Sequence, residues 1–226
     1  MESKVSSFTL LKKGLIVSCQ VPDGTPIDTP EFIAAQAETV ILAGAVGVRV
    51  QGVANVQAVS NSVTVPIIGL IKRSSPETPI HITPEVDDVL RLEQAGADIV
   101  ALDATGRLRR NGQTFNDFID EVRKKTSIPI LADVDTVEAA VCAEKLGCEA
   151  VATTLSGYTA APAPELPNIG LISEISKKVA IPVIAEGGFS RPEHFLDALT
   201  AGAWAVCIGT AITNPYLMTK SFVEKI

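Results

Sequence analysis

The chain has 226 residues, of which 46% are hydrophobic, 20% are charged and only 4% are aromatic. Such a composition is typical of a globular protein with an aliphatic core, and it excludes a largely disordered chain. The formal net charge of −7 at pH 7 argues against a nucleic-acid-binding surface. The chain contains no apolar run of about 18 residues, so we expect no membrane span.

The cysteines and the N-terminal segment indicate the compartment. Four cysteines occur, none in a CxxC pair and none at the spacing of a zinc site: Cys19, Cys142, Cys148 and Cys207. We expect them to be reduced thiols that pack as small hydrophobic groups. The first residues, MESKVSSFTLLKKG, lack the design of a signal peptide. These features predict a cytoplasmic protein.

The apolar pattern predicts strands and helices that alternate along the chain. Near-continuous apolar runs predict eight strands, within residues 14–20, 43–50, 65–73, 95–103, 128–136, 146–154, 181–189 and 201–209. Amphipathic patterns predict helices over residues 29–44, 84–96, 114–126, 136–147, 168–179 and 191–202. Strands of this kind are buried on both faces, which indicates a parallel sheet covered by helices.

Two phrases recur along the chain. The first starts with proline and continues as a β-branched run, as in VPIIGLIKR from Val65 and IPVIAEGGF from Ile181. The second carries a glycine directly after a helical pattern, where a left-handed residue would end the helix. These glycines are Gly44, Gly96, Gly147 and Gly202, roughly fifty residues apart, which corresponds to two βα units each.

Eight βα units in this length predict a single (β/α)₈ barrel domain over residues 1–226, a TIM barrel with short loops. An open doubly wound sheet is the alternative. That fold usually carries a glycine-rich dinucleotide turn after its first strand, and SCQVPDGTP from Ser18 is not such a turn. We therefore favour the barrel.

Catalytic residues of such barrels lie at the carboxyl ends of the strands. The polar residues that close the eight predicted strands are, in order, Gln20, Arg49, Lys72, Asp103, Asp133, Thr153 with Thr154, Glu186, and Gly209 with Thr210. Strands three and seven lie on opposite sides of an eight-stranded ring, so Lys72 and Glu186 should face each other across the mouth. Partial burial lowers the pKa of a lysine and raises that of a glutamate, which suits proton transfer at neutral pH. A structural ion pair at the rim is the alternative interpretation.

Glycines follow the last two strands. Gly187 and Gly188 lie in EGGFSRPEHF, and Gly209 and Thr210 lie in IGTAITNP. Loops at these two places frequently hold a phosphate group in this fold, because backbone N–H groups and a helix N-terminus meet there. Simple turn formation is the alternative.

Other candidates for chemistry are weaker. We expect His81 and His194 to be surface or packing residues, and most of the basic stretch GRLRR from Gly106 to be a solvated loop. No HExxH motif or carboxylate cluster occurs, so we expect neither a metal nor another cofactor.

Taken in order, GLIVSCQ, GAVGVRV, VPIIGLIKR, ALDAT, TTLSGYT, VIAEGG and GTAIT resemble the N-acetylmannosamine-6-phosphate 2-epimerase family, from about Gly14 to Ile212. Members of this family are (β/α)₈ barrels of sialic-acid catabolism. They interconvert N-acetylmannosamine 6-phosphate and N-acetylglucosamine 6-phosphate without a metal or a nucleotide. The resemblance therefore implies an isomerase that binds a phosphorylated N-acetylhexosamine. For this chain, one possible assembly is a homodimer.

The resemblance also implies roles for individual residues. Lys72 and Glu186 would be the catalytic acid and base, and the glycine loops would bind phosphate. Three residues, Gln20, Arg49 and Asp133, would contact the sugar and its N-acetyl group. Tyr158, in SGYT, would line the pocket.

The chain departs from the family pattern at three places. Ser74 follows Lys72 and Arg73 where an aspartate is usual, and Asp135 stands where a serine is commoner. Asn214 stands where the family usually has an arginine that assists phosphate binding. Two rival functions stay open: an aldolase that uses Lys72 as a Schiff-base nucleophile on a phosphorylated sugar, and a phosphosugar-binding barrel without catalysis.

Overall fold

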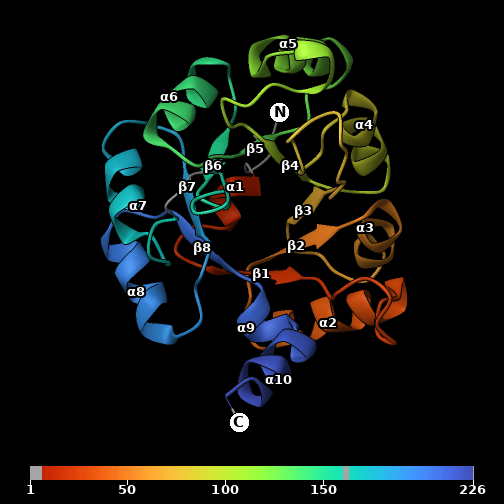
Figure 1. Cartoon of the computed structure of the whole chain (residues 1–226). Helices are drawn as coiled ribbons and strands as arrows, with labels where there is room; N and C mark the ends of the chain where they lie inside the picture. Colours follow the sequence, from red (N-terminus) through yellow and green to blue (C-terminus); the bar gives the residue numbers. More distant parts are fainter. Residues whose placement is uncertain (1–6, 160–162, 226) are drawn as a thin grey trace, which may run out of the picture.

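Eight parallel strands close into a barrel in the computed structural model, which describes residues 7–159 and 163–225 (Figure 1). The strands are β1 (Leu15–Cys19), β2 (Gly47–Gln51), β3 (Ile67–Leu70), β4 (Ile99–Asp103), β5 (Ile130–Asp133), β6 (Ala150–Ala152), β7 (Val183–Glu186) and β8 (Ala205–Ile208). Each strand pairs in parallel with its neighbours in sequence order, and β8 pairs with β1. The predicted barrel is thus confirmed, and the open doubly wound sheet is excluded.

Helices surround the barrel as a ring (Figure 1). In the described residues they are α1 (Ser7–Leu10), α2 (Pro30–Leu42), α3 (Val53–Ser60), α4 (Val86–Gln94), α5 (Phe115–Lys125), α6 (Val137–Lys145), α7 (Ile169–Ser176), α8 (Pro192–Thr200), α9 (Thr210–Thr213) and α10 (Pro215–Val223), with a 3₁₀ turn η1 (Arg110–Gly112). All six predicted helices are present. The sequence pattern did not predict α3, whose eight residues, VANVQAVS, follow Gly52 without a side-chain cap.

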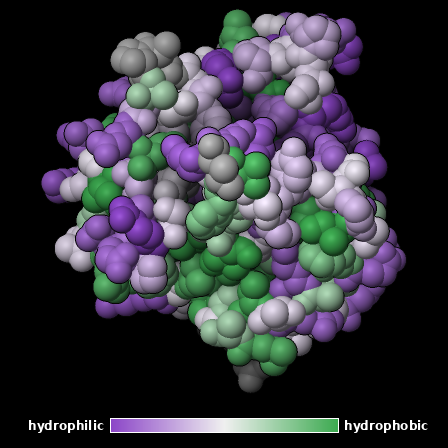
Figure 2. All heavy atoms as spheres, turned by 60° about the horizontal axis from the view of Figure 1, so that its bottom comes forward, coloured by the Kyte–Doolittle hydropathy of each residue, from purple (hydrophilic) through white to green (hydrophobic). Residues whose placement is uncertain are grey.

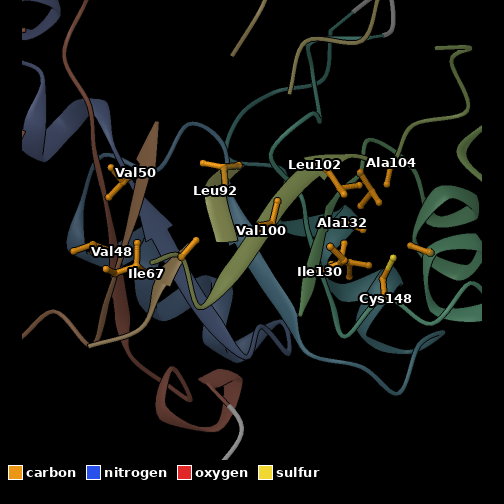
Figure 3. Close-up of a cluster of buried hydrophobic side chains, with 14 of the residues drawn as sticks. Val48, Val50, Ile67, Leu92, Val100, Leu102, Ala104, Ile130, Ala132 and Cys148 are labelled. Carbon is orange, nitrogen blue, oxygen red and sulfur yellow. The ribbon is translucent and has the colours of Figure 1, made fainter. Parts of the chain in front are cut away.

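Side chains alternate between the two faces of every strand, and this separates the core into two layers. Outward residues pack beneath the helices, among them Val48, Val50, Val100 and Leu102 (Figure 3). Inward residues such as Ile16, Ile68, Leu131 and Ile184 fill the barrel axis. Because inward positions repeat every second residue, the alternation carries the polar residue at the end of each strand to the mouth.

The turns that lead from a helix into the next strand contain the four glycines predicted to end helices. Gly44, Gly96, Gly147 and Gly202 all have positive φ angles, between 79° and 104°. At two of them a neighbouring helix also approaches closely: an added Cβ would lie 2.7 Å from Ser60 Cβ at Gly96 and 2.9 Å from Ser176 Cβ at Gly202. The same two serines donate hydrogen bonds to these turns, Ser60 to Ala95 O (3.0 Å) and Ser176 to Gly202 O (3.2 Å). The contact between a serine at the end of one helix and the turn after the following helix thus occurs twice in the ring.

The amino end of the barrel is closed by α1. Phe8 and Leu11 pack with the inward core residues, and Trp204 Nε1 donates a hydrogen bond to Phe8 O at 2.7 Å. Lys12 Nζ lies 4.6 Å from the Trp204 ring centre, a cation–π contact. The described residues of α1 and the turn after it thus cover the amino end of the barrel interior.

One sector of the helical ring is not covered. The short helix α9 follows β8, and α10 comes next; α10 projects away from the barrel, and none of its described residues is buried (Figure 1). Between α2 and α8 a groove of about 730 Å³ therefore remains, which we call the α2–α8 groove. Its apolar lining includes Leu15, Val46, Phe195, Leu196 and Ile212. Figure 2 shows apolar residues gathered on this lower face of the molecule.

Candidate functional site

A pocket of about 550 Å³ lies at the carboxyl ends of the strands. Its lining contains most of the predicted site residues, namely Gln20, Lys72, Tyr158, Glu186, Gly187, Gly188, Gly209 and Thr210. We call it the mouth pocket. It lies where (β/α)₈ barrels carry their active sites, so the topology places the predicted residues together as expected.

Arg49 lies beneath the mouth pocket and is almost completely buried, with 2% of its side chain exposed. It points inward from the middle of β2 and reaches across the barrel axis. Its Nη1 and Nη2 atoms donate to the two carboxylate oxygens of Asp133, at 3.0 and 2.7 Å. Nη1 also lies 3.0 Å from Glu186 Oε2. One guanidinium thus holds carboxylates from β5 and β7 in place.

Charge in this cluster is governed by burial and by the three groups themselves. Burial alone would lower the pKa of Arg49, but Asp133 and Glu186 outweigh it and raise the pKa, so the guanidinium stays charged. Burial raises the pKa of Glu186; Arg49 opposes this rise, and Asp133 adds to it. Two carboxylates therefore share one cation, and Glu186 is a weaker acid than an ordinary glutamate.

Lys72 follows the end of β3, pairs through its backbone with Ile82, and extends along the pocket wall. Its Nζ donates to Gln20 Oε1 at 2.5 Å and makes no ion pair with Glu186 in the described part of the chain. Burial lowers the pKa of Lys72, and Arg49 lowers it further. The residue as a whole is exposed, so solvent screens both effects. The rim ion pair that we considered between Lys72 and Glu186 does not form here.

Two threonines at the end of β6 complete the environment of Glu186. Thr153 Oγ1 accepts from the backbone N–H of Glu186 (3.0 Å) and donates to its carbonyl (2.9 Å). Thr154 Oγ1 lies 2.7 Å from Asp133 Oδ1 and 3.1 Å from Glu186 Oε2, and Thr154 lines the pocket. The sequence indicates both only as strand-end residues. Alternation along β6 puts Thr154 inward with Ala150 and Ala152, so the signal for its position was present in the sequence.

The loops after β7 and β8 supply free backbone donors to the pocket. Within residues 7–159 and 163–225, the N–H groups of six lining residues donate no hydrogen bond: Gly187, Gly188, Phe189, Gly209, Thr210 and Ala211. Gly187 and Gly188 have φ angles of 115° and 75°. A Cβ at Gly188 would lie 2.5 Å from Leu166 Cβ, so this loop is closely packed as well as left-handed.

The remaining predicted residues occupy varied positions. Tyr158 lies at the rim with 71% of its surface exposed. His81 is exposed and also lines the mouth pocket, where its Nδ1 lies 3.3 Å from Ser74 Oγ. Asn214 is buried, and its side chain caps α10 by accepting from Leu217 N (2.9 Å) instead of facing the pocket.

The strand-four carboxylate does not line the pocket. Asp103 is buried and binds Arg107 at 2.7 Å. In the stretch GRLRR, most of which we expect to be solvated, Arg109 is buried, 3.9 Å from the Phe118 ring centre. Both arginines hold the β4–α5 loop, so they leave the pocket chemistry to other strands.

In the described ranges no three His, Cys, Asp or Glu side chains lie close enough to hold a metal ion. No described helix is long and apolar enough to cross a membrane.

A closed parallel barrel with a polar pocket at the carboxyl ends of its strands defines the class of (β/α)₈-barrel enzymes. A sequence model described as "NanE: Putative N-acetylmannosamine-6-phosphate epimerase" matches residues 33–226. A protein named "Putative N-acetylmannosamine-6-phosphate 2-epimerase" from Caldanaerobacter subterraneus subsp. tengcongensis is 42% identical over 94% of this chain and 91% of its own. A protein of the same name from Klebsiella pneumoniae is 44% identical over 89% of this chain and 84% of its own. The chain belongs to the NanE family.

Solved structures agree with this assignment. The N-acetylmannosamine-6-phosphate 2-epimerase from Clostridium perfringens superposes with a TM-score of 0.91 at 35% identity, covering 100% of this chain and 99% of that one. Thiamine phosphate pyrophosphorylase from Pyrococcus furiosus has a TM-score of 0.63 at 16% identity, covering 96% and 98% of the two chains. This second likeness shows the shared barrel fold alone.

We expect Arg49→Gln to lower the free energy of unfolding by about 3–5 kcal/mol, because Asp133 and Glu186 would be left buried without a cation. Urea unfolding followed by circular dichroism measures this loss. Arg110→Gln is the matched control, since Arg110 pairs with Glu77 at the surface, where both side chains are more than half exposed. Its loss should be about 0–1 kcal/mol. Similar losses in the two variants would contradict a central role for Arg49.

Proposed function

We propose that this chain interconverts N-acetylmannosamine 6-phosphate and N-acetylglucosamine 6-phosphate by proton transfer at C2, in amino-sugar catabolism. The observation that carries the mechanism is the Glu186 carboxylate in the mouth pocket, with Lys72 on the opposite wall and no ion pair between them. An ion pair between the two would weaken the Glu186 carboxylate as a base. It would also hold the Lys72 ammonium away from the substrate. The geometry leaves both groups available to a sugar bound between them.

The reaction needs the open-chain sugar, because the aldehyde at C1 acidifies the proton on C2. Glu186 takes that proton, and the electron pair of the broken C–H bond moves through C1 to the aldehyde oxygen. The resulting enolate is stabilised by a nearby positive charge, for which we propose Lys72. Lys72 then delivers a proton to the opposite face of C2, and the carbonyl at C1 forms again. The raised pKa of Glu186 and the lowered pKa of Lys72 bring the two groups closer to the working pH.

The other polar residues have supporting roles in this proposal. Gln20 contacts Lys72 directly, so it can orient the ammonium as well as bind a sugar hydroxyl. Arg49 and Asp133 were predicted to contact the sugar and its N-acetyl group, and this stays a prediction. Their contacts in the structure are with Glu186 and Thr154. Tyr158 is placed to cover the sugar at the rim.

We propose that the six free N–H groups after β7 and β8 bind the phosphate. Successive backbone donors in a glycine loop form a concave anion site. None of the residues that line this side of the pocket is an arginine or a lysine. The phosphate would thus be held chiefly by backbone dipoles, and Asn214 takes no part because it caps α10.

The protein is expected to work without a metal or another cofactor, in the cytoplasm. Proton transfer beside an aldehyde needs only a base and an acid. All four cysteines are free thiols in the structure, in keeping with a reducing compartment. Neither nucleic acid nor membrane is proposed as a partner.

Turnover in D₂O tests the acid–base pair. We expect deuterium at C2 of the product, observed by NMR. Glu186→Gln and Lys72→Ala should each lose about 10²–10⁴-fold in kcat, the usual contribution of general acid–base catalysis. The exposed residues Glu193 and Lys177 provide matched controls, as Glu193→Gln and Lys177→Ala, which should keep full activity.

Borohydride trapping, together with turnover in D₂O, separates the rival functions. An aldolase would form an imine between Lys72 Nζ and the substrate carbonyl, and borohydride would trap it as a covalent adduct. A binding protein without catalysis would take up no deuterium. Either result would overturn the proposed epimerase mechanism.

Removal of the phosphate tests the anion site. We expect unphosphorylated N-acetylmannosamine to have a KM at least about tenfold higher, because one hydrogen bond to a charged group contributes roughly 1.5–3 kcal/mol. Inorganic phosphate should inhibit competitively. Equal kcat/KM values for the two sugars would contradict a phosphate site in the glycine loops.

We propose a homodimer in which α10 of one copy fills the α2–α8 groove of the other. In a (β/α)₈ barrel a helix normally follows each strand and covers the ring. Here the described residues that follow β8 leave the α2–α8 groove uncovered, while α10 exposes Tyr216, Leu217, Phe222 and Val223. An apolar groove and an apolar helix on the same chain are complementary, and both are hidden from water in such a dimer.

Light scattering after gel filtration measures this assembly. We expect twice the 23.7 kDa mass of one chain. The double variant Phe222→Asp, Val223→Asp should run as a monomer because it places charge in the groove. Leu108→Asp, which changes an apolar residue on the β4–α5 loop that is also more than half exposed, should remain a dimer. A monomeric wild-type chain at micromolar concentration would refute the proposal.

A further inference from the structure

The hydroxyl of Thr154 lies between two carboxylates. It is 2.7 Å from Asp133 Oδ1 and 3.1 Å from Glu186 Oε2. A hydroxyl has one proton and two lone pairs, so it can donate to only one of these oxygens at a time. Whichever carboxylate does not receive the proton faces a lone pair instead. The better acceptor therefore decides where the proton points.

Glu186 presents its two oxygens differently. Oε2 contacts both Arg49 Nη1 and Thr154 Oγ1. Within residues 7–159 and 163–225, neither Arg49 nor Thr154 contacts Oε1, and the Cys207 thiol also lies against this carboxylate. The partners of Oε2 thus hold the carboxylate plane, and Oε1, without a charged or hydroxyl partner, is the oxygen left to take a proton from a molecule in the pocket.

Protonation of Glu186 changes the balance between the two acceptors. While Glu186 is a carboxylate, its Oε2 and Asp133 Oδ1 are both charged oxygens that compete for the Thr154 proton. When Oε1 carries a proton, Oε2 becomes a neutral carbonyl oxygen and a weaker acceptor. Asp133, bound by both Nη atoms of Arg49, is then the stronger acceptor. The hydroxyl proton should turn toward Asp133 at this point.

We propose that Thr154 is a positioning residue for the epimerisation, which aims Oε1 of Glu186 at C2 and switches its own proton between Glu186 and Asp133 as Glu186 gains and loses the substrate proton. The proposal rests on the proposed role of Glu186 as the base. The step conserves protons: one passes from C2 to Oε1, and the threonine proton only rotates about the Cβ–Oγ bond. Both protonation states of Glu186 thereby keep a satisfied partner.

Other groups also face Glu186, and they bear on its titration. They are Arg49 from β2, Lys72 from β3, Asp133 from β5 and Cys207 from β8. Burial raises the pKa of the Cys207 thiol well above its ordinary value, so the thiol is neutral and adds no charge. Removing the Thr154 hydroxyl leaves all four in place, so a change in the titration reports on the hydroxyl.

The test compares three threonine variants. Thr154→Val should lower kcat about tenfold or more, the loss of a hydrogen bond to a charged group. KM should change less than kcat. The limb of kcat/KM that rises with pH should move to higher pH. The Thr154 hydroxyl lowers the pKa of Glu186, so its removal raises that pKa. Thr154→Ser should restore both properties. Thr159→Val removes a similar hydroxyl that binds Asp135 at 2.6 Å, and it should leave the rate and the limb unchanged.

Two outcomes separate the inference from the proposed function. If Glu186→Gln is inactive while folded Thr154→Val keeps the wild-type kcat and pH profile, the role of Thr154 is overturned and Glu186 remains the base. If Glu186→Gln keeps wild-type kcat, the base assignment itself fails. Circular dichroism checks folding of each variant. Should Thr154→Val not fold, Thr154→Ala provides the same comparison, since it removes the hydroxyl without adding bulk.

Discussion

The ion triad of Arg49, Asp133 and Glu186 is the interaction on which the rest of the site depends. It joins β2, β5 and β7 across the barrel axis, in surroundings where a lone charge would be costly. One guanidinium bonds both carboxylates, so the three strand ends must keep their spacing. The triad thereby sets the position of Glu186 before any substrate binds.

The triad also explains the state of Lys72. Arg49 already provides the cation for Glu186, and Lys72 turns to Gln20 instead. The carboxylate has an additional acidic neighbour in Asp133, which contributes to its raised pKa. One cation, Arg49, is thus buried beneath the pocket and paired with carboxylates, and a second, Lys72, lines the pocket beside Gln20.

Much of this arrangement could be predicted from the sequence, because it depends on local patterns and on a closed topology. Proline at the strand start and glycine at the helix end mark the βα units, and alternation then assigns Lys72 and Glu186 to the inner face. The partner of Glu186 could not be predicted in this way. Alternation shows that Arg49 points inward, but the reach across the barrel depends on register and side-chain length. Thr154 was missed because two threonines in succession were not assigned to opposite faces.

The course of α10 had no local signal either. Its residues fit a short helix after Asn214, yet the direction of a helix is set by what it packs against, and in the described chain α10 packs chiefly beside α9. The helix α3 was missed for a different reason. Its sequence has a weak apolar stripe and no capping side chain, so packing between α2 and α4 supports it more than its own propensity does.

The paired serine–glycine contacts lie four βα units apart, Ser60 with Gly96 in one half of the ring and Ser176 with Gly202 in the other. The chain therefore has an approximate twofold rotation axis along the barrel. That rotation carries β3 onto β7, and with it Lys72 onto Glu186. In the proposed mechanism a sugar carbon on this axis would meet one group on each side, so the inversion of a stereocentre would follow from the pseudo-symmetry of two half-barrels.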